Sequence, residues 1–205
     1  MIAVINYGLG NLTSIQNMFR RLSIDAVITD DKQKIRDASK ILLPGVGHFK
    51  KGMANLRENG IADLLQEEVI KKGKPILGIC LGAQLMTRHS EEGDVDGLGW
   101  VDAVTVKFDE ANLNNLPIPH MGWADIRTNA GCDLWNNLPT DPRFYFVHSY
   151  HFRFDNAAQV TATADYGYEF ACAFHKDNIY GTQFHPEKSH KFGMKMLENF
   201  NKITG

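Results

Sequence analysis

The 205-residue sequence has few cysteines, no long apolar run and almost no net charge. Its three cysteines are widely spaced and form no CxxC pair, which argues against a disulfide framework or a zinc site and favours a reducing, cytoplasmic environment. The apolar runs reach only about five residues, far short of the roughly 20 that a membrane-spanning helix needs. Lys and Arg number 22 against 24 Asp and Glu, so the charge indicates no surface for nucleic acid. These absences predict a soluble globular protein without nucleic-acid or membrane partners.

Short apolar runs alternate with helical periodicity in the first half of the chain. The pattern predicts strands over residues 2–5, 26–29, 41–43 and 75–79, and helices over 12–22, from 61 to about 72 and from 81 onward. Such alternation is typical of parallel strands joined by right-handed helical crossovers.

The second half changes to strands joined by short turns. The predicted strands cover residues 101–108, 143–147, 160–164, 170–175 and 179–184, and a last helix covers roughly 190–203. We therefore expect an α/β fold, with a single domain over residues 1–205. Its mixed central sheet is flanked by helices and has an antiparallel C-terminal portion.

The sharpest local feature is the sequence Gly-Ile-Cys-Leu-Gly at residues 78–82, between a predicted strand and a predicted helix. It has the form of a nucleophile elbow with Cys80 at its centre. The turn places the sulfur at a helix N-terminus, where peptide dipoles stabilise the thiolate, and leaves the Leu81 N–H free to donate to an oxyanion. A buried cysteine packed between glycines is the alternative. Cys132 and Cys172 lack such a setting and are interpreted as structural.

A nucleophilic cysteine needs a base and a group that orients that base. His185 lies in Gln-Phe-His-Pro-Glu at the end of a predicted strand. In an extended chain residues i and i+2 project to the same side, so Glu187 can reach the imidazole.

The other seven histidines indicate no comparable site. His120 falls in a predicted loop, and His148 and His151 are expected on opposite faces of one strand. The remaining histidines are isolated, and no Cys/His cluster has the spacing of a metal site. Neither a metal nor another cofactor is predicted.

Four motifs, taken in order, are those of a known family. They are Pro-Gly-Val-Gly (44–47), Gly-Ile-Cys-Leu-Gly-Ala-Gln (78–84), Phe-Tyr-Phe-Val-His-Ser-Tyr (144–150) and Gln-Phe-His-Pro-Glu-Lys-Ser (183–189). The chain resembles a class I glutamine amidotransferase, which implies one flavodoxin-like domain. Over nearly its full length it is similar to the glutaminase subunits of imidazole glycerol phosphate synthases.

The resemblance implies hydrolysis of glutamine to glutamate and ammonia. In that chemistry Cys80 is the nucleophile, His185 the base and acid, and Glu187 the carboxylate that orients it. The implied oxyanion donors are the backbone N–H groups of Leu81 and Val46. The implied substrate-binding residues are Gly47, Gln84, Glu92, Ser149 and Tyr150. Without the resemblance, Gln84 would be a solvated residue of a first helical turn and Glu92 a plain loop charge.

A partner is implied as well. The glutaminase motifs occupy the whole chain, and ammonia released into water is protonated and diffuses away, so a closed delivery path is expected. In the family a (β/α)₈ barrel synthase docks as the heterodimer partner, and the resemblance places Asn11, Trp123 and Lys188 at the junction. By themselves these residues would be a helix cap, part of a packed loop and a surface charge.

Several departures leave other functions open. Asn6, Ala83 and Ala124 differ from residues common in members that serve histidine synthesis, and residues 174–181 resemble paralogs that supply ammonia for amidation of a bacterial surface-polysaccharide sugar. Two alternatives of other classes are a stand-alone cysteine hydrolase and a scaffold without turnover. The motifs at 119–123 and 147–150 favour glutamine over the first, and the complete triad argues against the second.

Overall fold

The first half of the chain builds a parallel sheet. In the computed structural model, which describes residues 1–204, strands pair side by side in the order β2-β1-β3-β4, all parallel. Their bounds are β1 (Ile2–Ile5), β2 (Ala26–Thr29), β3 (Lys40–Leu43) and β4 (Ile76–Ile79). Strands β1 and β4 are buried on both faces, as expected of a parallel sheet covered by helices, whereas the edge strand β2 is only partly buried.

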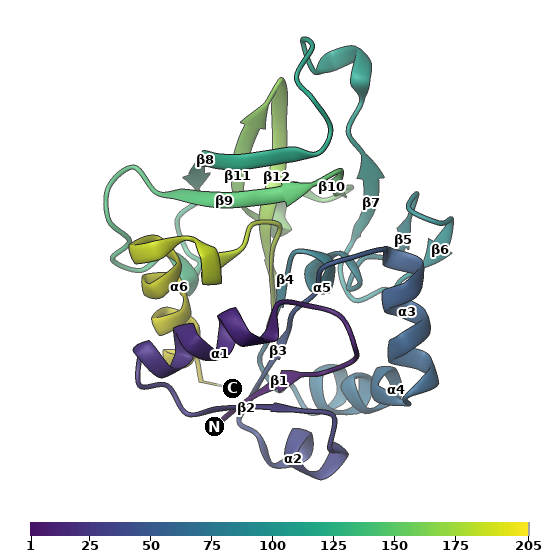
Figure 1. Ribbon diagram of the computed structural model, residues 1–205, viewed down its shortest axis with the longest axis vertical. Helices are drawn as coiled ribbons and strands as arrows, with labels where there is room; N and C mark the ends of the chain where they lie inside the picture. Colours follow the sequence, from purple (N-terminus) through teal and green to yellow (C-terminus); the bar gives the residue numbers. More distant parts are fainter. Residues whose placement is uncertain (205) are drawn as a thin grey trace.

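Helices cover both faces of these strands (Figure 1). On one face α1 (Leu12–Arg21) contributes Ile15 and Phe19 to a core that also contains Val4. On the other face α3 (Phe49–Glu58) and α4 (Ile61–Leu65) pack against the alternate strand residues, such as Ile5. The side-chain alternation of a strand therefore sends successive residues into two different cores.

The second half extends the same sheet with antiparallel strands. The order continues β4-β13-β12-β10-β7-β5-β6, in which the β4–β13 and β7–β5 pairs are parallel and the others antiparallel. The bounds are β5 (His89–Ser90), β6 (Val95–Asp96), β7 (Ala103–Lys107), β10 (Tyr150–Phe154), β12 (Tyr168–Lys176) and β13 (Ile179–Thr182). The predicted α/β class with a mixed, helix-flanked sheet is confirmed.

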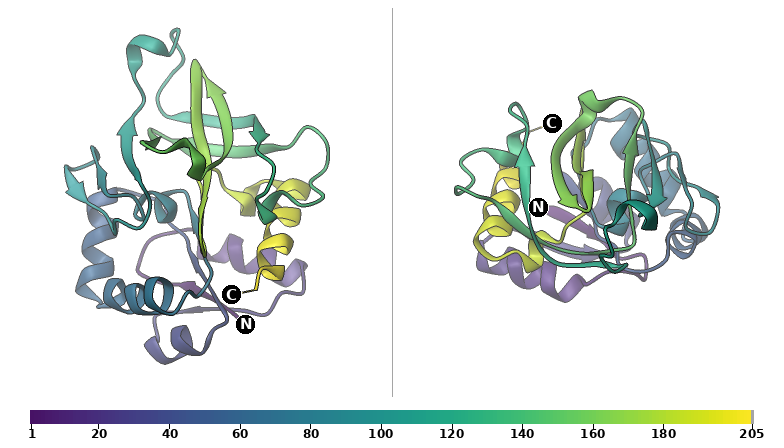
Figure 2. Two further views of the ribbon diagram at one scale, coloured as in Figure 1. Left: turned by 180° about the vertical axis from the view of Figure 1, so that it is seen from behind. Right: turned by 90° about the horizontal axis from the view of Figure 1, so that it is seen from above.

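Three further strands extend away from β12 and form the upper part of the molecule (Figures 1 and 2). They are β11 (Val160–Tyr166), β8 (His120–Thr128) and β9 (Arg143–His148), each antiparallel to the next. The C-terminal helix α6 (His190–Lys202) lies on the same side of the parallel strands as α1 (Figure 1).

Some predicted elements differ from the structure. Helices α2 (Lys32–Asp37) and α3 and strands β8 and β10 were not predicted, and α4 continues as a π-helix over Gln66–Lys71. The helix expected from residue 81 is a single turn, α5 (Leu81–Gln84). His120 begins a strand instead of lying in a loop, and His148 and His151 belong to two different strands.

The pairing of β4 with β13 decides where the predicted catalytic residues lie. Parallel strands end at the same edge of a sheet, and Ile79 is directly opposite Thr182 at that edge. One residue further on, the backbone N–H of Cys80 donates to the carbonyl oxygen of Thr182 at 2.7 Å. His185 lies three residues after Thr182. The pairing therefore brings Cys80 and His185, about a hundred residues apart in sequence, to the same edge of the sheet.

Among the helices of residues 1–204, none combines the length and apolar character needed to cross a membrane.

Candidate active site

Cys80 occupies a strained turn between β4 and α5. Its backbone has φ 53° and ψ −114°, a conformation that costs a non-glycine residue free energy and persists where the surrounding fold enforces it. A Cβ on Gly82 would overlap the carbonyl oxygen of Leu43. A Cβ on Gly78 would lie 2.6 Å from the Cα of Ala83. The two glycines thus allow the close approach that a nucleophile elbow requires.

His185 and Glu187 form a buried pair just beyond β13. Pro186 begins a short 3₁₀ turn, and this turn brings Nδ1 of His185 within 2.8 Å of Oε1 of Glu187, each side chain being 1% exposed. A carboxylate only accepts, so Nδ1 carries the donated proton and Nε2 is the free ring nitrogen. Ser189 fixes this turn, because its Oγ donates to the His185 carbonyl at 2.6 Å and accepts from the Tyr145 N–H at 3.0 Å.

The charge state of His185 depends on two opposing influences. Burial lowers its pKa, but the Cys80 thiolate, followed by the Glu187 carboxylate, outweighs burial and raises the pKa to about 10. The sulfur is close enough to act on the ring electrostatically. The sulfur and Nε2 of His185 do not form a hydrogen bond in this structure, since Nε2 has no hydrogen-bond partner among the described residues. The arrangement favours a protonated ring at His185 when the sulfur beside it is ionised.

A pocket of about 250 Å³ opens beside Cys80. Its lining includes every residue that the sequence analysis assigned to oxyanion or substrate binding, namely Val46, Gly47, Leu81, Gln84, Glu92, Ser149 and Tyr150. These residues come from loops after β3 and β4, the β5–β6 hairpin and the β9–β10 turn. The fold therefore brings these lining residues, from four separate segments of the chain, close to the Cys80 sulfur.

Two of these lining residues differ from their plain sequence interpretation. Gln84 is only 5% exposed instead of solvated, and its Nε2 donates to the Tyr150 carbonyl at 3.1 Å. Glu92 is not simply a loop charge, because its Oε2 accepts from the backbone N–H of Phe49 at 2.7 Å at the start of α3. Each side chain is thus held in place with a polar group at the pocket.

A family model for "Glutamine amidotransferase class-I" matches residues 3–203. The chain belongs to this family.

Related sequences and structures agree with that membership. The chain is 50% identical to imidazole glycerol phosphate synthase subunit HisH 2 of Methanococcus maripaludis, over 98% of this chain and 99% of that one. It is 44% identical to subunit HisH of Bdellovibrio bacteriovorus, over 99% and 100% of the two chains. Among solved structures, a glutamine amidotransferase superposes with a TM-score of 0.73 at 18% identity, over 98% and 99% of the two chains. PurLQS from Thermotoga maritima superposes with a TM-score of 0.75 at 19% identity, over 97% and 96%.

In this glutamine amidotransferase, two of the three expected junction residues gather around Tyr145. The Trp123 ring lies 6.2 Å from the Tyr145 ring and stacks on His190 at 5.4 Å. The Nζ of Lys188 lies 5.5 Å above the same Tyr145 ring. Asn11 caps α1 by accepting from the Ser14 N–H.

Ala124, which differs from the residue common in members that serve histidine synthesis, lies in β8 beside Trp123. Ala124 packs against the core, whereas its neighbour Trp123 is 41% exposed. Along a strand successive side chains face opposite sides, so Ala124 turns away from the surface that carries Trp123. The difference at this residue is therefore one of interior packing.

Several buried polar residues near the site were given no role by the sequence analysis. Tyr7 donates from its hydroxyl to the Pro44 carbonyl at 2.8 Å and so anchors the loop that carries Val46. Burial, and then the Cys80 thiolate, raises the pKa of Tyr7, which keeps it a donor. Gln183 and His148 also lie close to the sulfur or the pocket. The sequence feature that could have indicated such a role is a polar residue within the apolar run of a predicted strand, as at Gln183.

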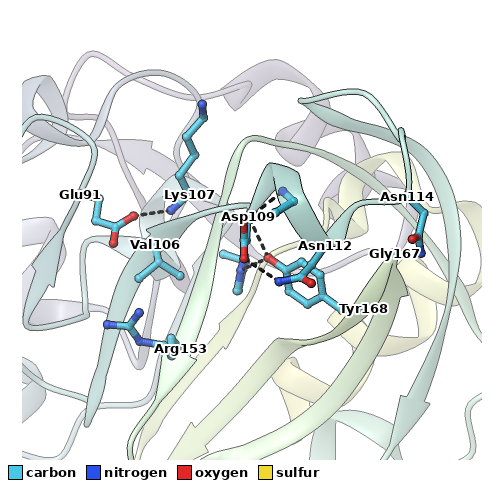
Figure 3. Close-up of a pocket in the computed structure, with 11 residues that line it drawn as sticks. Glu91, Val106, Lys107, Asp109, Asn112, Asn114, Arg153, Gly167 and Tyr168 are labelled. Atoms are coloured by element: carbon cyan, nitrogen blue, oxygen red, sulfur yellow. Dashed lines mark hydrogen bonds between the residues drawn. The ribbon is translucent and has the colours of Figure 1, made fainter.

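A larger pocket of about 720 Å³ lies over β7, β10 and β12 (Figure 3). None of the predicted site residues lines it. Its polar groups bond to one another: Asp109 donates its N–H to the Tyr168 hydroxyl, and Glu91 accepts from the Lys107 N–H at 2.8 Å. These four groups are therefore already paired with one another, whereas Nε2 of His185 has no partner among the described residues. Within residues 1–204 no group of three His, Cys, Asp or Glu side chains is arranged to hold a metal ion.

Proposed function

We propose that this protein is the glutaminase subunit of an imidazole glycerol phosphate synthase-type complex. It hydrolyses glutamine to glutamate and ammonia and passes the ammonia to a (β/α)₈ barrel synthase within a cytoplasmic heterodimer that serves histidine biosynthesis. Residues 1–205 act as one glutamine amidotransferase domain. The observation that carries the proposal is the meeting of the Cys80 elbow, the buried His185–Glu187 pair and the small polar pocket at one sheet edge.

The first half of the reaction forms a thioester. The thiol proton of Cys80 moves to Nε2 of His185, and the sulfur attacks the side-chain amide carbon of glutamine. The carbonyl oxygen becomes an oxyanion, for which the N–H groups of Leu81 and Val46 are the proposed donors. When the tetrahedral intermediate collapses, the imidazolium gives its proton to the departing nitrogen, and ammonia leaves.

The second half hydrolyses the thioester. His185 takes a proton from a water molecule, and the resulting hydroxide attacks the thioester carbon, forming a second oxyanion at the same donors. Collapse of this intermediate breaks the carbon–sulfur bond and releases glutamate. Glu187 stays ionised throughout and stabilises the imidazolium in both halves.

The remaining pocket residues hold the substrate. The Glu92 carboxylate suits the α-ammonium group of glutamine, and the Gln84 amide and the backbone at Gly47, Ser149 and Tyr150 supply neutral polar contacts. A pocket of about 250 Å³ has the size of a small amino acid. This size favours glutamine as the substrate over the peptide that a stand-alone cysteine hydrolase would cleave.

A partner surface is proposed beside the site. Trp123 is 41% exposed, Met121 62% and Val46 43%, an unusual concentration of exposed apolar groups next to the oxyanion loop and strand β8. Lys188 adds a charge on the same side through its contact with Tyr145. With Asn11 at the start of α1, these residues are the proposed contact with the barrel synthase.

The direct test measures ammonia released from glutamine by the purified chain, alone and with the barrel synthase. Cys80→Ser should lower the rate by at least about 10³-fold, because the hydroxyl is a far weaker nucleophile than the thiolate. Cys132→Ala, which removes a buried thiol elsewhere, should keep the rate. Full activity in Cys80→Ser would remove Cys80 as the nucleophile.

The acceptor is tested separately. The chain and glutamine are mixed with the histidine-pathway synthase or with the sugar-amidating enzyme of the paralogous systems, and the aminated product is identified. Product from the histidine-pathway synthase alone supports the proposal, and product from the sugar-amidating enzyme alone supports the alternative.

A further inference from the structure

The sulfur of Cys80 has a neutral hydrogen-bond donor that the reaction scheme does not use. Nε2 of Gln183 lies 3.7 Å from Sγ of Cys80, within the range of a hydrogen bond to sulfur. Gln183 is completely buried, two residues before His185. A buried amide must use its donors and acceptor within the protein, so its partners identify its role.

The orientation of the Gln183 amide follows from a chain of hydrogen bonds that begins at a backbone carbonyl. The Tyr150 carbonyl only accepts, so the Gln84 group 3.1 Å from it is the NH₂. The same NH₂ lies 3.1 Å from the Gln183 side chain, which must present its oxygen there. The NH₂ of Gln183 is thereby left to face the sulfur.

A buried histidine reinforces the same carbonyl. Nδ1 of His148 lies 2.7 Å from the Tyr150 oxygen and must donate to it. His148 is therefore unprotonated at Nε2 when neutral, and it accepts there from Nδ1 of His120 at 3.1 Å. The carbonyl that orients the two glutamines is thus held by two donors in a fully defined arrangement.

We propose that Gln183 is a positioning residue that stabilises the thiolate of Cys80 by donating to its sulfur, with Gln84 holding the amide in the required orientation. This inference rests on the proposed role of Cys80 as the nucleophile. A hydrogen bond to an ionised acceptor is stronger than one to a neutral acceptor, so the contact favours the state in which the proton has moved to His185. The amide has no basic site that competes with His185 for this proton.

Gln84 has a second consequence in this arrangement. It lines the substrate pocket and also fixes the Gln183 amide, so one side chain links the contents of the pocket to the charge on the sulfur. Loss of Gln84 should therefore affect the sulfur even when no glutamine is present.

The test is the rate at which iodoacetamide alkylates Cys80 in the full chain without glutamine, at neutral pH and at a pH where the thiol is fully ionised. Peptide mass spectrometry assigns the modification to Cys80. Gln183→Met, which keeps the length but removes the donor, should lower the neutral-pH rate about 10-fold and leave the alkaline rate unchanged. Gln183→Glu, which keeps the shape but faces the sulfur with an acceptor, should lower it about 100-fold. Gln84→Met should lower it by less than Gln183→Met.

A purely structural role for Gln183 predicts the opposite order, with the shape-matched Glu variant close to the wild type and the Met variant affected at both pH values. That result would overturn the inference, as would wild-type neutral-pH rates in both variants. Thermal melting followed by circular dichroism identifies a variant that does not fold. If one Gln183 variant does not fold, the alkylation rates of the other Gln183 variant test the inference. Gln66→Met is the remote control and should alkylate like the wild type. Failure of the proposed function is distinguishable, because Cys80→Ser would then retain ammonia release whatever the alkylation rates are.

Discussion

His185 and His120 are both almost completely buried, with 1% and 3% of their surfaces exposed, yet their pKa values move in opposite directions. The pKa of His185 is raised to about 10, whereas burial lowers that of His120 to about 4. Burial acts in the same sense on both rings, since it removes water from the imidazolium. What differs is the set of groups that each ring faces.

His185 faces two groups that carry negative charge, the Cys80 thiolate and the Glu187 carboxylate. His120 faces the neutral ring of His148 at 3.1 Å and stacks on Tyr166 and Phe146 at 4.0 and 4.8 Å. Burial, and then the neighbouring His120, also lowers the pKa of His148. Buried histidines in this protein thus have two settings, one that favours the charged ring at His185 and one that favours neutral, hydrogen-bonded rings at His120 and His148.

The largest expected effect comes from removing the carboxylate that distinguishes the two sites. Glu187→Gln should lower glutamine hydrolysis by about 10³–10⁴-fold, because the amide neither stabilises the imidazolium nor selects the required tautomer. Ammonia release measures the change. Glu198→Gln on α6, whose carboxylate pairs with Lys195, is the control and should keep its rate. A loss below about tenfold in Glu187→Gln would show that the carboxylate is not needed to keep His185 charged.

The next effect concerns the titration of His185 itself. Cys80→Ser removes the thiolate that contributes most to raising the pKa of His185, so the ring should titrate well below about 10. Titration followed by nuclear magnetic resonance of the ring carbons measures both sites at once. His120 should remain near 4 in the wild type and the variant. An unchanged His185 midpoint would contradict the assignment of Cys80 as its main anionic partner.

A smaller effect is expected on stability in acid. The unfolded chain protonates His120 near its ordinary pKa of 6.5, whereas the folded protein does not until about 4. The contribution of His120 to stability is therefore fully present above pH 6.5 and is lost as pH falls through this window, by up to about 3 kcal/mol. Urea unfolding as a function of pH should show a slope of this sign, to which the buried His148 contributes in the same sense, and His120→Phe should reduce it. Phe200→Leu, a change in the remote core, should lower stability at every pH and keep the slope.

The smallest effect is the coupling between the two neutral histidines. His120→Phe leaves Nε2 of His148 without its donor and should cost about 1–3 kcal/mol at neutral pH. Replacing both histidines by phenylalanine should cost less than the sum of the single changes, because the second removes the unpaired group left by the first. Strict additivity in a double-mutant cycle would show that the two rings do not interact.

The sequence predicts the parallel part of this fold well, because its strands are short apolar runs with sharp ends. The predicted limits of β1 and β2 agree with the structure to the residue. Strand β8 was missed because Gly122, Asp125 and Arg127 interrupt any apolar alternation, and the strand is held in place by its pairing with β9 and β11. Helix α3 was missed because Lys50, Lys51 and Gly52 obscure its buried face.

The residues of the site likewise divide into those that a local sequence motif predicts and those that depend on distant partners. Cys80 and the His185–Glu187 pair could be proposed from local sequence, since each lies in a short motif with its own geometry. The roles of Gln183 and His120 depend on partners 99 and 28 residues away, Gln84 and His148, and no local pattern reports such contacts. Long-range hydrogen bonding between buried polar groups is therefore the part of this site that needed coordinates.

The hydrogen bond from the Cys80 N–H to the Thr182 carbonyl joins the reactive turn to two strands at the centre of the sheet. That amide should be among the slowest in the chain to exchange with deuterium, since its release requires β4 and β13 to separate. On heating, loss of activity and loss of the whole tertiary structure should coincide, because the turn at Cys80 cannot become disordered while the sheet stays folded. Selection for a faster enzyme would then act mainly on the surrounding loops, because the turn that carries the sulfur cannot loosen by itself.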